Sequence, residues 1–249
     1  MRPAVRRPGA FRYRLRVSSG VHVGNVVEDV TPLTLDHVAF WVSDRDPIVG
    51  RCIEWLGMHT IDRQENFTLV GADARRGKLT FFDADGPRER GVFAELGLRV
   101  PDLARARAAL PPGTGETFDL GEGLAVRLVE AETDLAVDLD YVLLDASDPE
   151  QAAAAYEQLG FTRCDGTRLE VGGASLRLER GSSPWAERPL LNHIAVLVES
   201  AEEHRLEAEA RGIEVESTVE AANTRAVFLR APDGVRVEFV EHKASFSLV

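Results

Sequence analysis

Cysteine is scarce in this chain of 249 residues: only Cys52 and Cys164 occur, and neither has the spacing of a CxxC or CxxH motif. A disulfide framework and a structural zinc site are therefore not predicted, and a reducing, cytoplasmic setting is expected. Long apolar runs are also missing, because none approaches the roughly 20 residues that cross a bilayer. The arginine-rich start lacks the apolar core of a secretory signal, so residues 1–32 are expected to form an N-terminal arm outside the fold.

Basic residues are few relative to acidic ones, 29 against 41, which gives a net charge of −12. Nucleic acids and anionic membranes would be repelled by such a chain, so neither is expected as a partner. Only Lys78 and Lys243 are lysines, and the arginine excess is interpreted as a general bias rather than a binding patch. A hydrophobic content of 44% is enough for a sizeable core. A small-molecule substrate is the expected partner.

An apolar, strand-like segment occurs four times, at a period of about 50 residues. The copies are LDHVAFWVSD from Leu35, GVFAELGLRV from Gly91, DLDYVLLDAS from Asp138 and LNHIAVLVES from Leu191. Each is followed by helix-start signals, namely a short polar capping residue or a proline, and then by shorter β-prone runs separated by turn residues. The sequence thus predicts an α+β protein of four strand–helix–three-strand units.

The predicted units follow the arm without long linkers, at residues 33–88, 89–134, 135–184 and 185–249. A helix covers one face of such a sheet and leaves the other face to line a cavity. His37 and His193 occupy the third position of the first and fourth copies. Simple alternation places both histidines away from the helices. The residues expected on their faces are Leu35, Ala39 and Trp41 for the first copy and Leu191, Ala195 and Leu197 for the fourth.

Four βαβββ units, a histidine in the first strand and the closing run FLRAPDGVRVEFVE from Phe228 resemble the vicinal oxygen chelate superfamily. That superfamily includes glyoxalase I, extradiol dioxygenases, fosfomycin-resistance transferases, methylmalonyl-CoA epimerase and bleomycin-binding proteins. The resemblance extends from about Leu33 to His242. It implies that the units pair into two curved mixed sheets with the helices outside, and that a divalent ion is held by the first and last strands of paired units.

The ligand positions implied by the resemblance are His37, Glu95, Tyr141 and His193 on the first strands, and Thr80, Arg127, Arg177 and Glu238 on the last strands. Only His37, His193 and Glu238 make a plausible divalent site, a set of two histidines and one carboxylate. This set requires the first unit to pair with the fourth and the second with the third. The middle pair is expected to be a salt-bridged structural counterpart.

Some assignments around this set are less specific. Glu241 and His242 are rivals of Glu238 in the register of the last strand. Trp41, Thr80 and Phe228 are expected to line the substrate pocket, and no catalytic residue beyond the ligands is assigned. Iron(II) is the favoured ion, with zinc, nickel, cobalt and manganese as alternatives.

The favoured activity is that of an extradiol-type dioxygenase acting on a small organic substrate, because the glyoxalases and epimerases that the chain resembles usually have a fourth carboxylate or amide ligand where it has Thr80. Against this, Phe228 stands where extradiol enzymes have a tyrosine, and residues 212–229 contain no histidine. Two alternatives stay open: an isomerase, lyase or transferase of the glyoxalase, epimerase or fosfomycin-resistance type, and a non-catalytic ligand-sequestering protein. A monomer or a homodimer is expected.

Overall fold

The structure is a computed structural model that describes residues 31–181 and 186–249, so the predicted N-terminal arm lies almost entirely outside the described residues. The first unit contains β1 (Thr34–Val42), α1 (Arg45–Leu56), β2 (His59–Arg63), β3 (Phe67–Gly71) and β4 (Lys78–Asp83). The second contains β5 (Phe93–Val100), α2 (Leu103–Ala108), β6 (Thr117–Asp119) and β7 (Ala125–Glu130).

The third unit contains β8 (Asp138–Ala146), α3 (Pro149–Gln158), β9 (Thr162–Asp165), β10 (Arg168–Val171) and β11 (Ala174–Arg180). The fourth contains β12 (Leu191–Leu197), α4 (Ala201–Ala210), β13 (Val215–Glu220), β14 (Thr224–Arg230), the short helical turn η1 (Pro232–Gly234) and β15 (Arg236–His242). The second unit therefore has two strands after its helix and not three. Pro111, Pro112 and Gly113 occupy the position of the missing strand, where prolines cannot donate to a ladder.

Local signals account for the helix boundaries. The side chains of Asp102, Asp148 and Ser200 accept hydrogen bonds from free amides at the starts of α2, α3 and α4. Helix α1 begins after Asp44 and ends at Gly57, which adopts the left-handed conformation. Among the described residues no helix combines the length and the apolar character needed to span a membrane.

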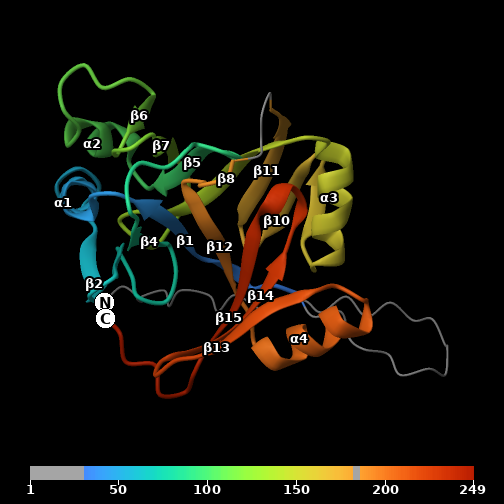
Figure 1. The fold of residues 1–249 in the computed structure, drawn as a ribbon. Helices are drawn as coiled ribbons and strands as arrows, with labels where there is room; N and C mark the ends of the chain where they lie inside the picture. Colours follow the sequence, from blue (N-terminus) through green and yellow to red (C-terminus); the bar gives the residue numbers. More distant parts are fainter. Residues whose placement is uncertain (1–30, 182–185) are drawn as a thin grey trace, which may run out of the picture.

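Two mixed sheets form the architecture, and the α+β fold class is confirmed (Figure 1). The first sheet has eight strands in the order β13-β14-β15-β12-β1-β4-β3-β2, and the second has seven in the order β6-β7-β5-β8-β11-β10-β9. Strands of the first and fourth units thus share one sheet, and strands of the second and third units share the other. The four helices lie at the periphery, and one apolar cluster joins residues of both sheets and of the helices.

The two units of the eight-stranded sheet join along the antiparallel pair β1 and β12, which contains two register shifts. Asp36 is the additional residue of one bulge and Asn192 that of the other. A bulge changes the parity of a strand and redirects a side chain. The predicted alternation is therefore wrong at Leu35 and Leu191, which lie in the main apolar core and not on the histidine faces.

In the seven-stranded sheet, the strands β5 and β8 correspond to β1 and β12, and side chains fill the space beside them. Arg127 Nε donates to Glu95 Oε1 at 3.1 Å, which confirms the predicted salt bridge. The Tyr141 hydroxyl also donates to Glu95. Arg177 is not part of this salt bridge, because it stacks on the Tyr141 ring at 3.6 Å and pairs with Asp140. Burial alone would raise the pKa of Glu95, but hydrogen bonds from Thr117, Tyr141 and Arg127 outweigh it and lower that pKa.

The Tyr141 ring fits only because residue 97 is glycine, since a Cβ there would lie 2.2 Å from two ring carbons. Gly97→Ala is therefore expected to lower the free energy of unfolding by about 1–3 kcal/mol through overpacking. Gly50→Ala is the control, because Gly50 lies in α1 and a methyl group added there would have no neighbouring atom within 4 Å, so stability should be unchanged or slightly raised. Urea unfolding of both variants tests this, and equal losses would contradict it.

Candidate metal centre

Three adjacent strands bring together the three predicted ligands. His37 on β1, His193 on β12 and Glu238 on β15 come from the centre of the eight-stranded sheet. The Nε2 atoms of the two histidines are 2.9 Å apart. Glu238 Oε2 lies 2.9 Å from His193 Nε2 and 3.3 Å from His37 Nε2. Within residues 31–181 and 186–249 this is the one group of at least three such side chains close enough to share an ion.

Each histidine is oriented by the residue that precedes it, the bulged residue of its strand. His37 Nδ1 donates to Asp36 Oδ1 at 2.7 Å, and His193 Nδ1 donates to Asn192 Oδ1 at 2.9 Å. A carboxylate and an amide oxygen can only accept, so the proton of each neutral ring lies on Nδ1. The lone pair of each Nε2 is then available to an ion, which is the usual arrangement of a metal-binding histidine.

A further set of contacts fixes the two orienting residues. Asp36 is 1% exposed, and its carboxylate lies 2.8 Å from Lys78 Nζ and 2.8 Å from His242 Nε2. Asn192 Oδ1 also accepts from Arg236 Nη1 at 2.9 Å, and Arg236 pairs with Glu216. The histidines are thus held by buried groups whose own hydrogen-bonding capacity is used, which limits their rotation.

Burial and charge determine the protonation of the centre. Burial alone would raise the pKa of Glu238, but its interactions with the neighbouring His193 and His37 outweigh burial and hold that pKa far below its ordinary value. For His37, burial opposes the charged form, yet hydrogen bonds to Asp36 and Glu238 raise its pKa to about 9. Burial lowers the pKa of His193. In the free chain the protonated His37 ring therefore lies between two carboxylates, with Nδ1 toward Asp36 and Nε2 toward Glu238, and a bound ion would have to displace the proton on Nε2.

The three ligand atoms fit a divalent ion. Two donor atoms about 2.1 Å from one ion and at right angles are about 3 Å apart, which is close to the three observed separations. Two imidazoles and one carboxylate on the same side leave the opposite side of an ion open. His37, His193 and Glu238 would hold the ion, and among the described residues no further histidine, cysteine or carboxylate joins this group.

The open side faces a cavity of about 610 Å³. Thr80 on β4 and Phe228 on β14 line this cavity. Trp41 does not: its ring packs on Phe82 at 5.4 Å, and it lines a separate hollow, because the end of β1 carries it past the ligand cluster. The prediction for Trp41 is corrected accordingly.

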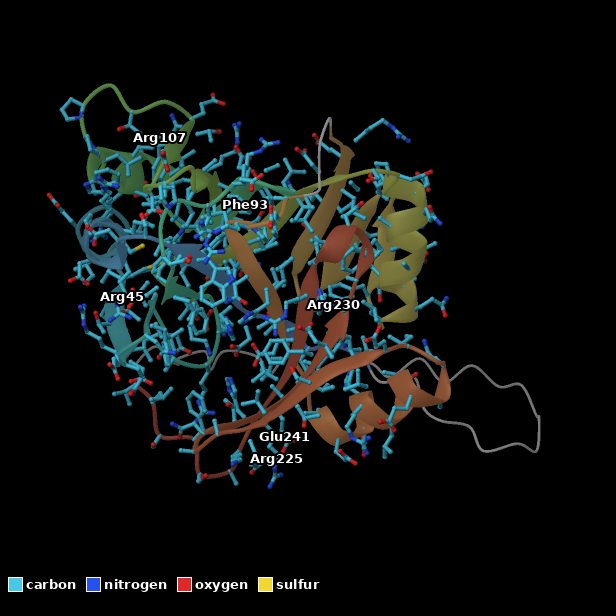
Figure 2. The ribbon with its side chains drawn as sticks, in the orientation of Figure 1. Arg45, Phe93, Arg107, Arg225, Arg230 and Glu241 are labelled. Carbon is cyan, nitrogen blue, oxygen red and sulfur yellow. The ribbon has the colours of Figure 1, made fainter. Side chains whose placement is uncertain are left out.

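Neither rival of Glu238 reaches the ligand atoms. Glu241 pairs with Arg225 at 3.3 Å, and Figure 2 shows the two side by side at the outer end of the sheet. His242 contacts Asp36 instead. Sequence reasoning missed the orienting role of Asp36 and Asn192, although both strands contain a leucine, then Asp or Asn, then the histidine. That repeated triplet is the signal that was available.

Comparisons with known proteins agree on the fold. No family model matches the chain, and no curated protein matches its sequence. A solved structure from Bacillus subtilis, provisionally named a dioxygenase, has a TM-score of 0.71 and 17% identity over 87% of each chain.

Two further solved structures show the same similarity. Glyoxalase I from Zea mays has a TM-score of 0.64 and 18% identity over 84% of this chain and 92% of its own. The cppA protein of Streptococcus pneumoniae has a TM-score of 0.59 and 14% identity over 85% of this chain and 99% of its own. The chain therefore has a glyoxalase-like fold.

Proposed function

We propose that the protein is a metal-dependent enzyme of the extradiol dioxygenase type, in which His37, His193 and Glu238 hold iron(II). The observation that supports this is the convergence of three ligand atoms, 2.9–3.3 Å apart, at the floor of a cavity. The substrate is a small organic molecule that chelates the ion through two adjacent oxygens.

Ligand number favours this reaction type over the isomerases. Thr80 is buried beside the cluster, and its neutral hydroxyl is a poor substitute for a fourth carboxylate or amide ligand. Three protein ligands leave enough positions for two substrate oxygens and dioxygen together. Iron(II) held by His37, His193 and Glu238 would bind the substrate and dioxygen side by side, so that electrons pass from the chelated substrate to dioxygen. Separations near 3 Å also suit ligands at right angles better than the wider tetrahedral spacing of zinc.

The protein's own contribution is orientation and exclusion of water. Asp36 and Asn192 fix the two histidine rings, while Phe82 and Phe228 contact the ring of His193 at centroid distances of 6.2 and 5.3 Å. These rings make the surroundings of the open side apolar, which strengthens electrostatic interactions there.

A ligand-sequestering protein is the second candidate, and one observation favours it. Among the described residues that line the cavity there is no tyrosine, and its histidines are the two ligands themselves. Phe228 occupies the position at which extradiol enzymes have a tyrosine, so the usual acid or base for proton transfer is lacking at this position. A protein that only binds its ligand has no need of such a group.

Elemental analysis and oxygen uptake separate these candidates. Protein purified anaerobically without chelator is expected to contain about one iron per chain and to consume oxygen with a catechol. Glu238→Ala should lose most of the ion, because only two ligands remain. Glu241→Ala is the matched control on the same strand and should retain it, since Glu241 pairs with Arg225.

The results have distinct meanings. Iron without oxygen uptake would support the sequestering candidate, and zinc, nickel or manganese would redirect the search to isomerase or epoxide chemistry. A wild-type chain that neither contains nor takes up a divalent ion would contradict the metal-dependent function.

The orienting role of Asn192 gives a separate prediction. Asn192→Ala should weaken binding of the ion by about 10- to 100-fold, because His193 loses the acceptor that fixes its ring. Arg236 keeps its partner Glu216, so folding should be largely preserved. Competition with a chromophoric chelator measures the affinity, and circular dichroism monitors folding. Unchanged affinity in a folded variant would show that the bulged residue does not position the ligand.

A further inference from the structure

The walls of the cavity indicate which substrates the centre accepts. Phe82 on β4 and Phe228 on β14 stand on opposite sides of the three ligand strands, because the sheet order places β4 beyond β1 and β14 beyond β15. Both rings contact the His193 ring, from two directions. A ligand that reaches the open side of the centre must therefore pass between aromatic side chains.

Two more phenylalanines extend these walls. Phe67 on β3 packs on Phe82 with ring centroids 5.5 Å apart. Phe246, from the segment after β15, stacks on His242 at 4.3 Å and lines the cavity together with Leu248. Four rings from four separate segments thus surround the space above the ligands. Flat ring faces favour a planar ligand, because offset and edge-to-face contacts between rings are preferred arrangements.

The charges of the cavity restrict its ligand further. Lys78 is the one cationic side chain among the described residues of the lining, apart from the histidines, and it is 3% exposed and bound to Asp36. Arg75 and Arg236 stack on Phe246 and Phe228 without lining the cavity. Asp62 adds negative charge to the lining. A further carboxylate or phosphate on the ligand would find no unpaired cationic side chain among the described lining residues, and Asp62 would repel it.

We infer that the substrate is a planar ring compound with two adjacent oxygens and no further anionic group, an inference that rests on the proposed metal-dependent function. The same lining disfavours ring diols that have a carboxylate or phosphate inside the cavity. Leu69 on β3, half-buried in the wall, is then a residue that sets this selectivity.

The test compares 4-methylcatechol with 3,4-dihydroxybenzoate, which share the ring and the two oxygens and differ by a methyl or a carboxylate. Both are titrated anaerobically by calorimetry into the full chain loaded with the ion found by elemental analysis. The neutral compound should bind at least about tenfold more tightly, because the carboxylate of the other finds no unpaired cation in the described lining and is repelled by Asp62. Leu69→Arg should narrow or reverse this ratio, since a long arginine can place its charge in the cavity. Leu69→Gln, polar but uncharged, should not.

Ion content is measured first, because it distinguishes a failure of the proposed metal-dependent function from a failure of the substrate assignment. Equal or tighter binding of the benzoate to the loaded wild type overturns the inference and leaves the metal centre in place. Failure of both compounds to bind to loaded protein overturns the planar-ring assignment. A chain that takes up no ion overturns the proposed function, and the inference with it. Thermal unfolding checks that both Leu69 variants are folded. If folded Leu69→Arg has the same ratio of affinities for the two compounds as the wild type, Leu69 does not set this selectivity.

Discussion

The antiparallel pairing of β1 with β12 is the constraint on which the centre depends. In this register His37 faces Ala195, and His193 faces Ala39. Each alanine follows the histidine of its own strand by two residues and leaves room for the ring of the other strand. A single ladder therefore brings two residues 156 positions apart to a Nε2–Nε2 distance of 2.9 Å. Glu238 joins them because β15 pairs in parallel with β12, with Glu238 beside Ala195.

Such a centre is costly for the free chain. Glu238 and Asp36 are buried carboxylates, and each depends on nearby histidines or Lys78 for compensation. Buried ionic groups seldom add net stability over apolar residues of the same size. Groups of this kind that gather at a cavity with strongly shifted pKa values are more typical of functional sites. The two orienting groups also differ, because Asp36 is charged and Asn192 is neutral, so the two histidines are not equivalent donors.

The sequence was sufficient for the repeated units, for the proximity of His37, His193 and Glu238 and for most helix starts, because each leaves a local signal: an apolar run, a capping residue, a histidine at a repeated position. It was insufficient where long-range geometry decides. The bulges at Asp36 and Asn192 arise from pairing between distant strands and reverse the parity that alternation assumes, so Leu35 was misplaced. Phe246 reaches the cavity through a packing contact with His242 that has no local pattern.

In the seven-stranded sheet, side chains fill the place that corresponds to the His37, His193 and Glu238 group. Bulges recur there at Ala94 and Asp140, and Gly97 faces Tyr141 as Ala39 faces His193. The phenol ring of Tyr141 is larger than an imidazole ring and leaves no room for a Cβ on the facing residue, which explains why residue 97 is glycine. Glu95 is then occupied by Arg127 and Tyr141 instead of an ion. The two sheets thus share their bulges and differ in the volume and charge of a few facing residues, and among the described residues only the eight-stranded sheet brings together a group of side chains that could hold an ion.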